Sequence, residues 1–290
     1  MRLKSFLGLL RGQTPKLEIR KLLEMRIAFC VALKNRCRNE VYPEDSRQYI
    51  KHFLDKLTVS PFPLNDFEKT DTKIVLTLFP KMVRSLVAQK KPTDDWVLVV
   101  TDFGSTDANV EEMLTKEIGT AMPFHVHTET EWKFFDRGGG LKKSAQIAEE
   151  KFHADAVFFC DADLIFHERH VFDECYKALK ENKFFYPIFF AFADTWHMDG
   201  FWRDTSFGNF AGTLAEYKKT AGWKHNISWG WEDRDLADSI PKEKKVRMPV
   251  SGFCHQWHPM VWEFRVAEYP VKEYLFKGAA VSHLPIELNT

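Results

Sequence analysis

The sequence has no surplus of charge of either sign and no apolar run long enough to cross a membrane. Lysine plus arginine and aspartate plus glutamate each total 41, so the formal net charge is zero. A neutral chain has no general attraction to nucleic acid or to an anionic membrane, and we expect neither partner. The apolar residues near the N-terminus stop at Arg11, well short of the ~20 residues that a transmembrane helix needs.

No small-residue cleavage site follows this N-terminal stretch, so no secretion signal is visible. We therefore expect a cytoplasmic protein without a transmembrane segment. Residues 1–25 are expected to form a helical extension that docks on the domain, with peripheral membrane contact as the alternative.

Cysteines are few, and none form a CxxC pair. An odd number with wide spacing excludes a dense disulfide framework and favours a reducing compartment. The five cysteines are Cys30, Cys37, Cys160, Cys175 and Cys254.

Short apolar runs alternate with segments of helical period. Strands are expected at 27–33, 96–101, 123–129 and in the run that ends before Asp161, and helices from about 109, after the glycines at 138–140, and around 171–179. Residues 71–90 have helical period, with a break or kink at Pro80. This alternation predicts one α/β domain with a mostly parallel sheet and helices on both faces.

Polar motifs follow the ends of these strands. Lys34 and Arg36 follow the first strand, Asp102 the second, and the pair Asp161 and Asp163 another. Ligands of parallel sheets gather at the carboxyl ends of the strands, so we expect these residues to line one crevice.

A metal site is predicted from Asp163 together with His255 and His258, which are three residues apart. Carboxylate and imidazole ligands suit a divalent transition metal, and oxygen-rich sites suit Mn²⁺ or Mg²⁺. The D-x-D pair is a weak signal by itself, and three alternatives stay open. They are a structural zinc site, for which the cysteines are poorly placed, a non-haem iron site, which the α/β pattern disfavours, and a core histidine with a satisfied hydrogen bond.

Two loops have the composition of nucleotide-binding turns. Gly138 opens a glycine turn at the start of a helix, where backbone donors and Arg137 could hold a phosphate. Asp102 could accept a hydrogen bond from a base or ribose. Each loop could equally be an ordinary helix start or capped turn, and only together do they suggest a nucleotide diphosphate.

The segment WGWEDRDL places acids beside aromatic rings. Rings stack on the apolar faces of sugars and carboxylates accept hydroxyl protons, so this segment is typical of a carbohydrate site, in which one acid could act as a general base. The alternative is an acidic helix N-terminus. The residues are Trp229, Trp231, Glu232, Asp233 and Asp235.

Five motifs in this order, FFCDADLIF, FFYPIFF, FWRDTSFG, WGWEDRDL and PVSGFCHQWHP, resemble those of the inverting GT-A glycosyltransferases. The likeness is to the β-1,4-galactosyltransferase and chondroitin N-acetylgalactosaminyltransferase group, and it covers roughly 26–262. It implies a GT-A nucleotide-diphospho-sugar transferase fold over 26–290, with a nucleotide-binding half at 26–183 and an acceptor and metal half at 184–265. Members of this family usually carry an anchor for the Golgi lumen, so a trimmed lumenal domain is the alternative to a cytoplasmic relative.

The resemblance also implies a role for each matched residue. It implies that Asp163, His255 and His258 bind the metal, and His255 replaces a methionine of the galactosyltransferases. It implies that Asp233 is the catalytic base. The implied nucleotide-sugar residues are Ala32, Leu33, Lys34, Arg36, Asp102, Arg137, Gly138, Asp161 and Ala162, and the implied sugar and acceptor pocket is Trp202, Trp229, Gly230, Trp231 and Glu232.

The expected activity follows from these roles. A Mn²⁺-dependent enzyme, with Mg²⁺ as the alternative ion, would move a hexose or N-acetylhexosamine from a UDP-sugar to a glycan or glycoconjugate hydroxyl with inversion. Two alternatives remain: another donor such as a UDP-uronic acid or GDP-mannose, and a binding module without catalysis.

Overall fold

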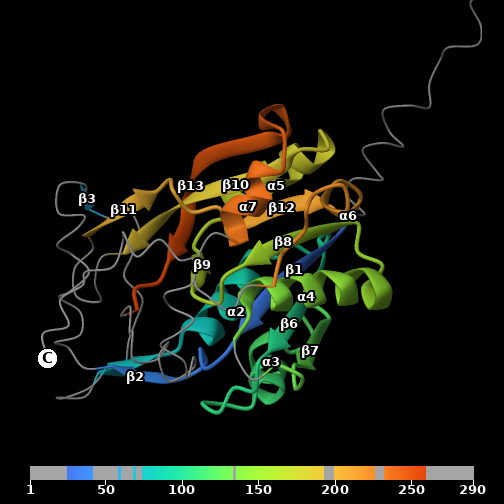
Figure 1. Cartoon of the computed structure of the whole chain (residues 1–290). Helices are drawn as coiled ribbons and strands as arrows, with labels where there is room; N and C mark the ends of the chain where they lie inside the picture. Colours follow the sequence, from blue (N-terminus) through green and yellow to red (C-terminus); the bar gives the residue numbers. More distant parts are fainter. Residues whose placement is uncertain are drawn as a thin grey trace, which may run out of the picture.

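The computed structural model describes residues 25–41, 58–59, 68–69, 74–132, 135–192, 199–225 and 232–258. Within these ranges the chain forms a main sheet of ten strands and a small sheet of three, and helices flank the main sheet (Figure 1). The expected N-terminal extension, apart from residue 25, lies outside the described residues, as do Trp229, Gly230 and Trp231.

Four strands form the parallel centre of the main sheet: β1 (Arg26–Leu33), β6 (Asp95–Asp102), β7 (Phe124–Thr128) and β8 (Ala156–Cys160). β1 lies between β8 and β6 and pairs in parallel with both, and β6 pairs in parallel with β7. β1, β6 and β8 are almost wholly buried, as expected for parallel strands covered on both faces. All four strands were predicted from the sequence.

The second half of the chain extends this sheet with mixed pairing. Its strands, with two short ones from earlier in the chain, are β3 (Thr58–Val59), β9 (Leu164–Phe166), β10 (Phe184–Phe192), β11 (Asp199–Arg203), β12 (Phe210–Thr213) and β13 (Lys245–His255). β12 inserts antiparallel between β8 and β10, while β13 pairs in parallel with β10 and antiparallel with β9. The small sheet contains β2 (Asn39–Val41), β4 (Glu68–Lys69) and β5 (Ile74–Leu76).

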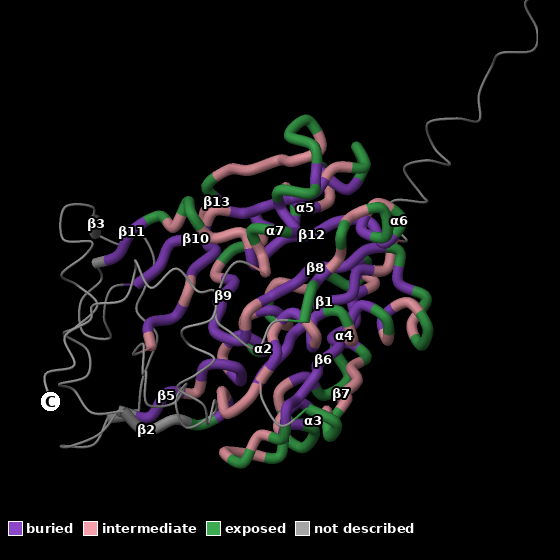
Figure 2. Tube along the Cα trace, viewed as in Figure 1, coloured by how far each residue is buried: buried purple, intermediate pink, exposed green. Residues whose placement is uncertain are grey.

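Helices cover both faces of the sheet. One face of β1, with Phe29 and Val31, packs against α2 (Leu78–Gln89), α3 (Val110–Ile118) and α5 (His170–Lys180). The opposite face, with Cys30 and Ala32, packs against α4 (Arg137–Phe152). Figure 2 shows the central strands as the most continuously buried part of the chain. The remaining helices are α6 (Leu214–Tyr217), α7 (Glu232–Asp238) and the 3₁₀-helix η4 (Lys242–Lys244).

The expectation of a helix over 71–90 that Pro80 breaks or kinks is wrong. Residues 74–76 form β5, and α2 begins only at Leu78, so Pro80 is the third residue of the helix. The first N–H groups of a helix have no intrahelical partner, so proline removes no hydrogen bond there. Helical period alone therefore did not separate a short strand from the helix that follows it.

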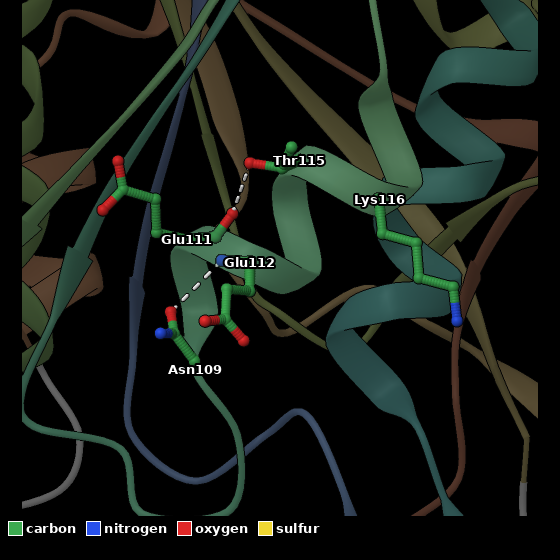
Figure 3. A pocket seen from close by; sticks show the side chains of 5 residues that line it. All are labelled: Asn109, Glu111, Glu112, Thr115 and Lys116. Carbon is green, nitrogen blue, oxygen red and sulfur yellow. Dashed lines mark hydrogen bonds between the residues drawn. The ribbon is translucent and has the colours of Figure 1, made fainter.

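α3 begins where the sequence predicts. Asn109 precedes it, and its side chain accepts a hydrogen bond from the Glu112 amide at 3.1 Å. Figure 3 shows a hollow on this helix, lined by Asn109, Glu111, Glu112, Thr115 and Lys116. The Thr115 hydroxyl donates to the Glu111 carbonyl, so both hydrogen bonds in the hollow belong to the helix itself. No helix in the described part of the chain is long and apolar enough to cross a bilayer.

Candidate active site

The predicted metal ligands meet at the carboxyl end of the sheet. Asp163 lies in the turn between β8 and β9. β9 runs antiparallel to β13, and this pairing sets His255 opposite Leu164 and therefore beside Asp163. The Nε2 atom of His255 is 3.3 Å from Asp163 Oδ1, and that of His258 is 3.0 Å from Asp163 Oδ2. One ligand atom from each residue lies within 4.8 Å of the others, so a single cation can contact all three.

The charge states of this group suit a metal at neutral pH. Burial lowers the pKa of His255 to about 4, which keeps its imidazole neutral. Burial alone would raise the pKa of Asp163. Attraction to His255 and His258 when these rings are protonated, together with a hydrogen bond from His258, outweighs burial and lowers that pKa well below its usual range. Arg36, in the loop after β1, acts in the same direction.

One oxygen of this carboxylate lacks a hydrogen bond. Asp163 Oδ1 is buried and accepts none from the described residues. A buried, ionised oxygen without a donor is costly unless a cation balances it. Carboxylate and imidazole are common ligands of divalent transition metals, so these residues fit the metal that the sequence predicts.

The first acid of the D-x-D pair has protein partners instead. Arg137 Nε donates to Asp161 Oδ1 at 2.7 Å, and Asn209 Nδ2 donates to Asp161 Oδ2 at 2.8 Å. The Asn209 side-chain oxygen in turn accepts from the Asp161 amide at 2.7 Å. The two acids are therefore not equivalent: of this pair, Asp163 has a buried carboxylate oxygen that accepts no hydrogen bond from the described residues, and Asp161 does not.

Arg137 joins Asp161 to the acidic helix α7. Its Nη1 is 3.6 Å from Glu232 Oε1, its Nη2 donates to the Gly208 carbonyl at 2.8 Å, and its Cζ is 5.1 Å from the centre of the Trp223 ring. Burial alone would lower the pKa of Arg137, but the carboxylates of Asp161 and Glu232 raise it above its ordinary value. The guanidinium thus orients these acids, and its contact with a nucleotide stays a prediction.

The acids of the WGWEDRDL motif open α7. The Glu232 side chain is only 9% exposed, and burial raises its pKa, with Asp233 adding like charge. Asp233 Oδ2 accepts a hydrogen bond from the Phe207 amide at 3.2 Å, and its Oδ1 accepts from the Arg234 amide at 2.9 Å. Backbone donors therefore orient the Asp233 carboxylate, as a general base requires; its role as the base stays a prediction.

Close packing explains the glycine turn. The buried Asp136 caps α4: its Oδ1 accepts from the Gly139 amide at 2.8 Å, and its Oδ2 is 2.7 Å from His225 Nδ1. A Cβ at Gly138 would lie 2.1 Å from the Lys224 carbonyl oxygen. Of the two readings left open, the structure supports the helix start, and contact of Gly138 with a nucleotide stays a prediction.

Two loops at the same edge are tied to each other. Asp102 Oδ1 accepts hydrogen bonds from the Ser105 amide at 3.0 Å and from its hydroxyl at 2.6 Å, so Asp102 caps the turn. Ser105 Oγ accepts from the Asn35 amide at 3.0 Å. This bond holds the loop that carries Lys34 and Arg36 against the end of β6. Contacts of these residues with a base, ribose or phosphate stay predictions.

The other predicted residues differ in exposure. Ala32, Leu33 and Ala162 are buried, and their contact with a nucleotide stays a prediction. Trp202 is 37% exposed and packs edge-on against Phe190, with ring centres 5.7 Å apart. An exposed ring on this scaffold suits a sugar pocket, and that role also stays a prediction.

Several residues of this region were missed by the sequence reasoning. Asp136, just before a glycine turn, carries the signature of a helix N-cap and could have been found. Asn209 and Arg247 have no such signal, because their partners Asp161 and Ser206 lie in loops more than 40 residues away in the sequence. Trp132 is 40% exposed and stacks on His225 at 4.7 Å and 10°, a contact that pairs two loops far apart in the chain.

The sequence is similar to chondroitin sulfate synthase 3 of two mammals. No family model matches the chain. Over 146 residues it is 27% identical to human chondroitin sulfate synthase 3 and 28% identical to the mouse protein of that name. The match covers 43% of this chain and 16% of each relative, so the chain corresponds to a small part of those proteins.

Comparison with solved structures identifies the fold. The S. aureus TarS 1–349 structure has a TM-score of 0.51 and 12% identity, over 91% of this chain and 76% of that one. The same protein in complex with UDP-GlcNAc has a TM-score of 0.50 and 11% identity, over 81% and 59%. The chain therefore has the GT-A fold of nucleotide-diphospho-sugar transferases. In sequence the chain is similar to chondroitin sulfate synthase 3, which confirms the resemblance that its motifs predict.

Proposed function

We propose that the protein is a metal-dependent, inverting glycosyltransferase that moves a hexose or N-acetylhexosamine from a UDP-sugar to a glycan or glycoconjugate hydroxyl. The observation that carries the proposal is the group of Asp163, His255 and His258 at the carboxyl end of the sheet, with its unsatisfied carboxylate oxygen. Similarity to chondroitin sulfate synthase 3 and a fold shared with a protein that binds UDP-GlcNAc favour this chemistry.

Asp163, His255 and His258 would hold the cation, with Mn²⁺ as the first choice and Mg²⁺ as the alternative. When bound, such an ion supplies positive charge and Lewis-acid help for a diphosphate leaving group. The neutral His255 ring and the ionised Asp163 carboxylate are already in the forms that bind metal.

In this proposal, residues 26–183 bind the nucleotide. Lys34, Arg36 and Asp102 stand at the strand ends that would surround the UDP moiety. Asp161, whose carboxylate accepts from Arg137 at 2.7 Å, would lie on the ribose side.

Asp233 is the proposed base. It accepts the proton of the acceptor hydroxyl as that oxygen forms a bond to the anomeric carbon of the donor. The bond from this carbon to the diphosphate oxygen breaks, and its electron pair leaves with UDP. A direct displacement of this kind turns an α-linked donor into a β-linked product. Trp202, Trp229, Gly230, Trp231 and Glu232 would shape the sugar and acceptor pocket.

Two alternatives are kept. The donor could be another nucleotide sugar, such as a UDP-uronic acid or GDP-mannose, because no described contact specifies the sugar hydroxyls. A binding module without catalysis is less favoured, since a binder needs no general base, and the amides that orient the Asp233 carboxylate suit that role.

The test is release of UDP from a panel of UDP-sugars by the purified protein with Mn²⁺. Asp163→Ala and His258→Ala should abolish release. Asp233→Ala should abolish release but retain binding of UDP with Mn²⁺. Asp238→Ala, an exposed acid at the end of the same helix, should match the wild type. Release that survives in Asp163→Ala would remove the metal from the proposal.

A further inference from the structure

One loop connects the metal side of the site to the proposed base. It covers residues 204–209, between β11 and β12, and is here called the 204–209 loop. Its Gly208 carbonyl accepts from Arg137, and its Asn209 side chain bonds Asp161. Its Phe207 amide donates to Asp233 Oδ2 at 3.2 Å. The position of this loop therefore sets the direction of the Asp233 carboxylate.

Arg247 holds the other end of the loop from β13. Its Nη2 donates to the carbonyl oxygen of Ser206 at 3.0 Å and also to that of Asp204. Its Cζ lies 4.1 Å from the centre of the Phe207 ring. Two backbone carbonyls and one ring thus fix the residues on which the Phe207 amide depends.

Burying the guanidinium of Arg247 beside this loop costs desolvation free energy. Arg247 Nη1 is buried and has no hydrogen-bond partner in the described ranges, and burial lowers the pKa of the side chain. A hydrocarbon side chain would pack against Phe207 without that desolvation penalty. What it could not do is hold two carbonyl oxygens in a defined direction, because that needs the planar donors of a guanidinium.

We propose that Arg247 is a positioning residue for the reaction: it clamps the 204–209 loop so that the Phe207 amide keeps the Asp233 carboxylate directed at the acceptor hydroxyl. This inference rests on the proposed function, in which Asp233 is the base. A displacement of a reacting group by about 1 Å can lower a rate about a hundredfold, so loss of the clamp should slow turnover without weakening donor binding.

The kinetic test compares Arg247→Ala, Arg247→Gln and the wild type in UDP release with Mn²⁺. Arg247→Ala should lower kcat by about 10- to 100-fold, with the donor KM changed less than about twofold. Arg247→Gln can still donate to one carbonyl and should recover part of kcat. Arg84→Ala, which removes a half-exposed arginine from its pair with Glu117, is the matched control. A kcat of Arg247→Ala within twofold of the wild type, or an equal loss in the alanine and glutamine variants, overturns the inference.

Deuterium exchange of the 204–209 loop, read by mass spectrometry, separates this inference from the proposed function. Arg247→Ala and Asp233→Ala should both speed exchange in this segment and leave β1 and β6 unchanged. Unchanged exchange in Arg247→Ala, or faster exchange throughout the chain, means that no clamp exists. If the wild type turns over no UDP-sugar but both variants open this segment, the function fails and the clamp stands.

Discussion

Replacing Arg137 by methionine should destabilise the protein more than any surface arginine change. Methionine keeps an apolar side chain against Trp223 but removes the charge that Asp161 and Glu232 share. Three carboxylates, counting Asp233, would then lie close together without a cation. The substitution therefore tests whether Arg137 stabilises the folded protein, in addition to its predicted contact with the nucleotide.

The magnitude follows from the exposure of the pair. Removing one partner of a fully buried ion pair costs about 3–5 kcal/mol. The side chains of Arg137 and Asp161 are 19% and 28% exposed, which places the cost at the low end, about 3 kcal/mol after solvent screening. The side chain of Arg84 is 50% exposed in its pair with Glu117, so this guanidinium keeps its contact with water and should contribute no more than about 1 kcal/mol, and Arg84→Met is the matched control.

The cost of Arg137→Met should shrink on acidification. Burial already raises the pKa of Glu232, and Arg137 works against that rise. Without Arg137 the pKa of Glu232 increases further, so the folded state takes up a proton at a pH where the unfolded state does not. Stability of the variant then rises as the pH falls through the folded pKa toward the unfolded value.

Urea unfolding at pH 7.5 and pH 5 measures both effects through the free energy of unfolding. We expect Arg137→Met to lower the free energy of unfolding strongly at pH 7.5 and less at pH 5. Arg84→Met should change it little at either pH. A loss below about 1 kcal/mol at pH 7.5, the range of surface pairs, would refute the buried-network reasoning. A loss that is equal at both pH values would show that Glu232 does not respond to Arg137.

Three further outcomes are expected. Mn²⁺ should raise the melting temperature of the wild type, because a ligand bound only by the folded state stabilises it, and Asp163→Asn should remove the shift seen by differential scanning fluorimetry. Gly138→Ala should lower the free energy of unfolding by about 2 kcal/mol, because its Cβ would lie 2.1 Å from the Lys224 carbonyl oxygen, whereas the exposed Gln146→Ala on the same helix should be near neutral; equal urea midpoints would contradict this. Asp136→Ala should cost about 1–2 kcal/mol through the lost N-cap, and an unchanged midpoint would mean that the cap adds nothing.

Local sequence patterns predicted the parallel centre well, for a physical reason. β1, β6 and β8 are buried on both faces and therefore appear as unbroken apolar runs. Each ends in polar residues at one edge of the sheet, and strand direction alone brings these ends together. The same logic failed for 71–90, because a three-residue strand and a helix with proline in its first turn share one apolar period.

The sequence by itself determined which chemical groups are available and which edge of the sheet they reach. It identified Asp163, His255 and His258 as a ligand set, and the motif resemblance implied different roles for the two acids of D-x-D. It could not supply the pairing of β9 with β13, which brings His255 beside Asp163, because strand pairing between segments about 90 residues apart has no local signature.

Only the tertiary structure decided how the charges are balanced. In the folded protein, Arg137 and Asn209 both donate hydrogen bonds to Asp161. The Phe207 amide donates to Asp233 and so orients its carboxylate. These contacts depend on the insertion of β12 between β8 and β10 and on the loop that precedes it. In the unfolded chain every hydrogen-bond donor and acceptor can bond water. Burial removes that water, so each group is left with the partner that the tertiary structure places beside it.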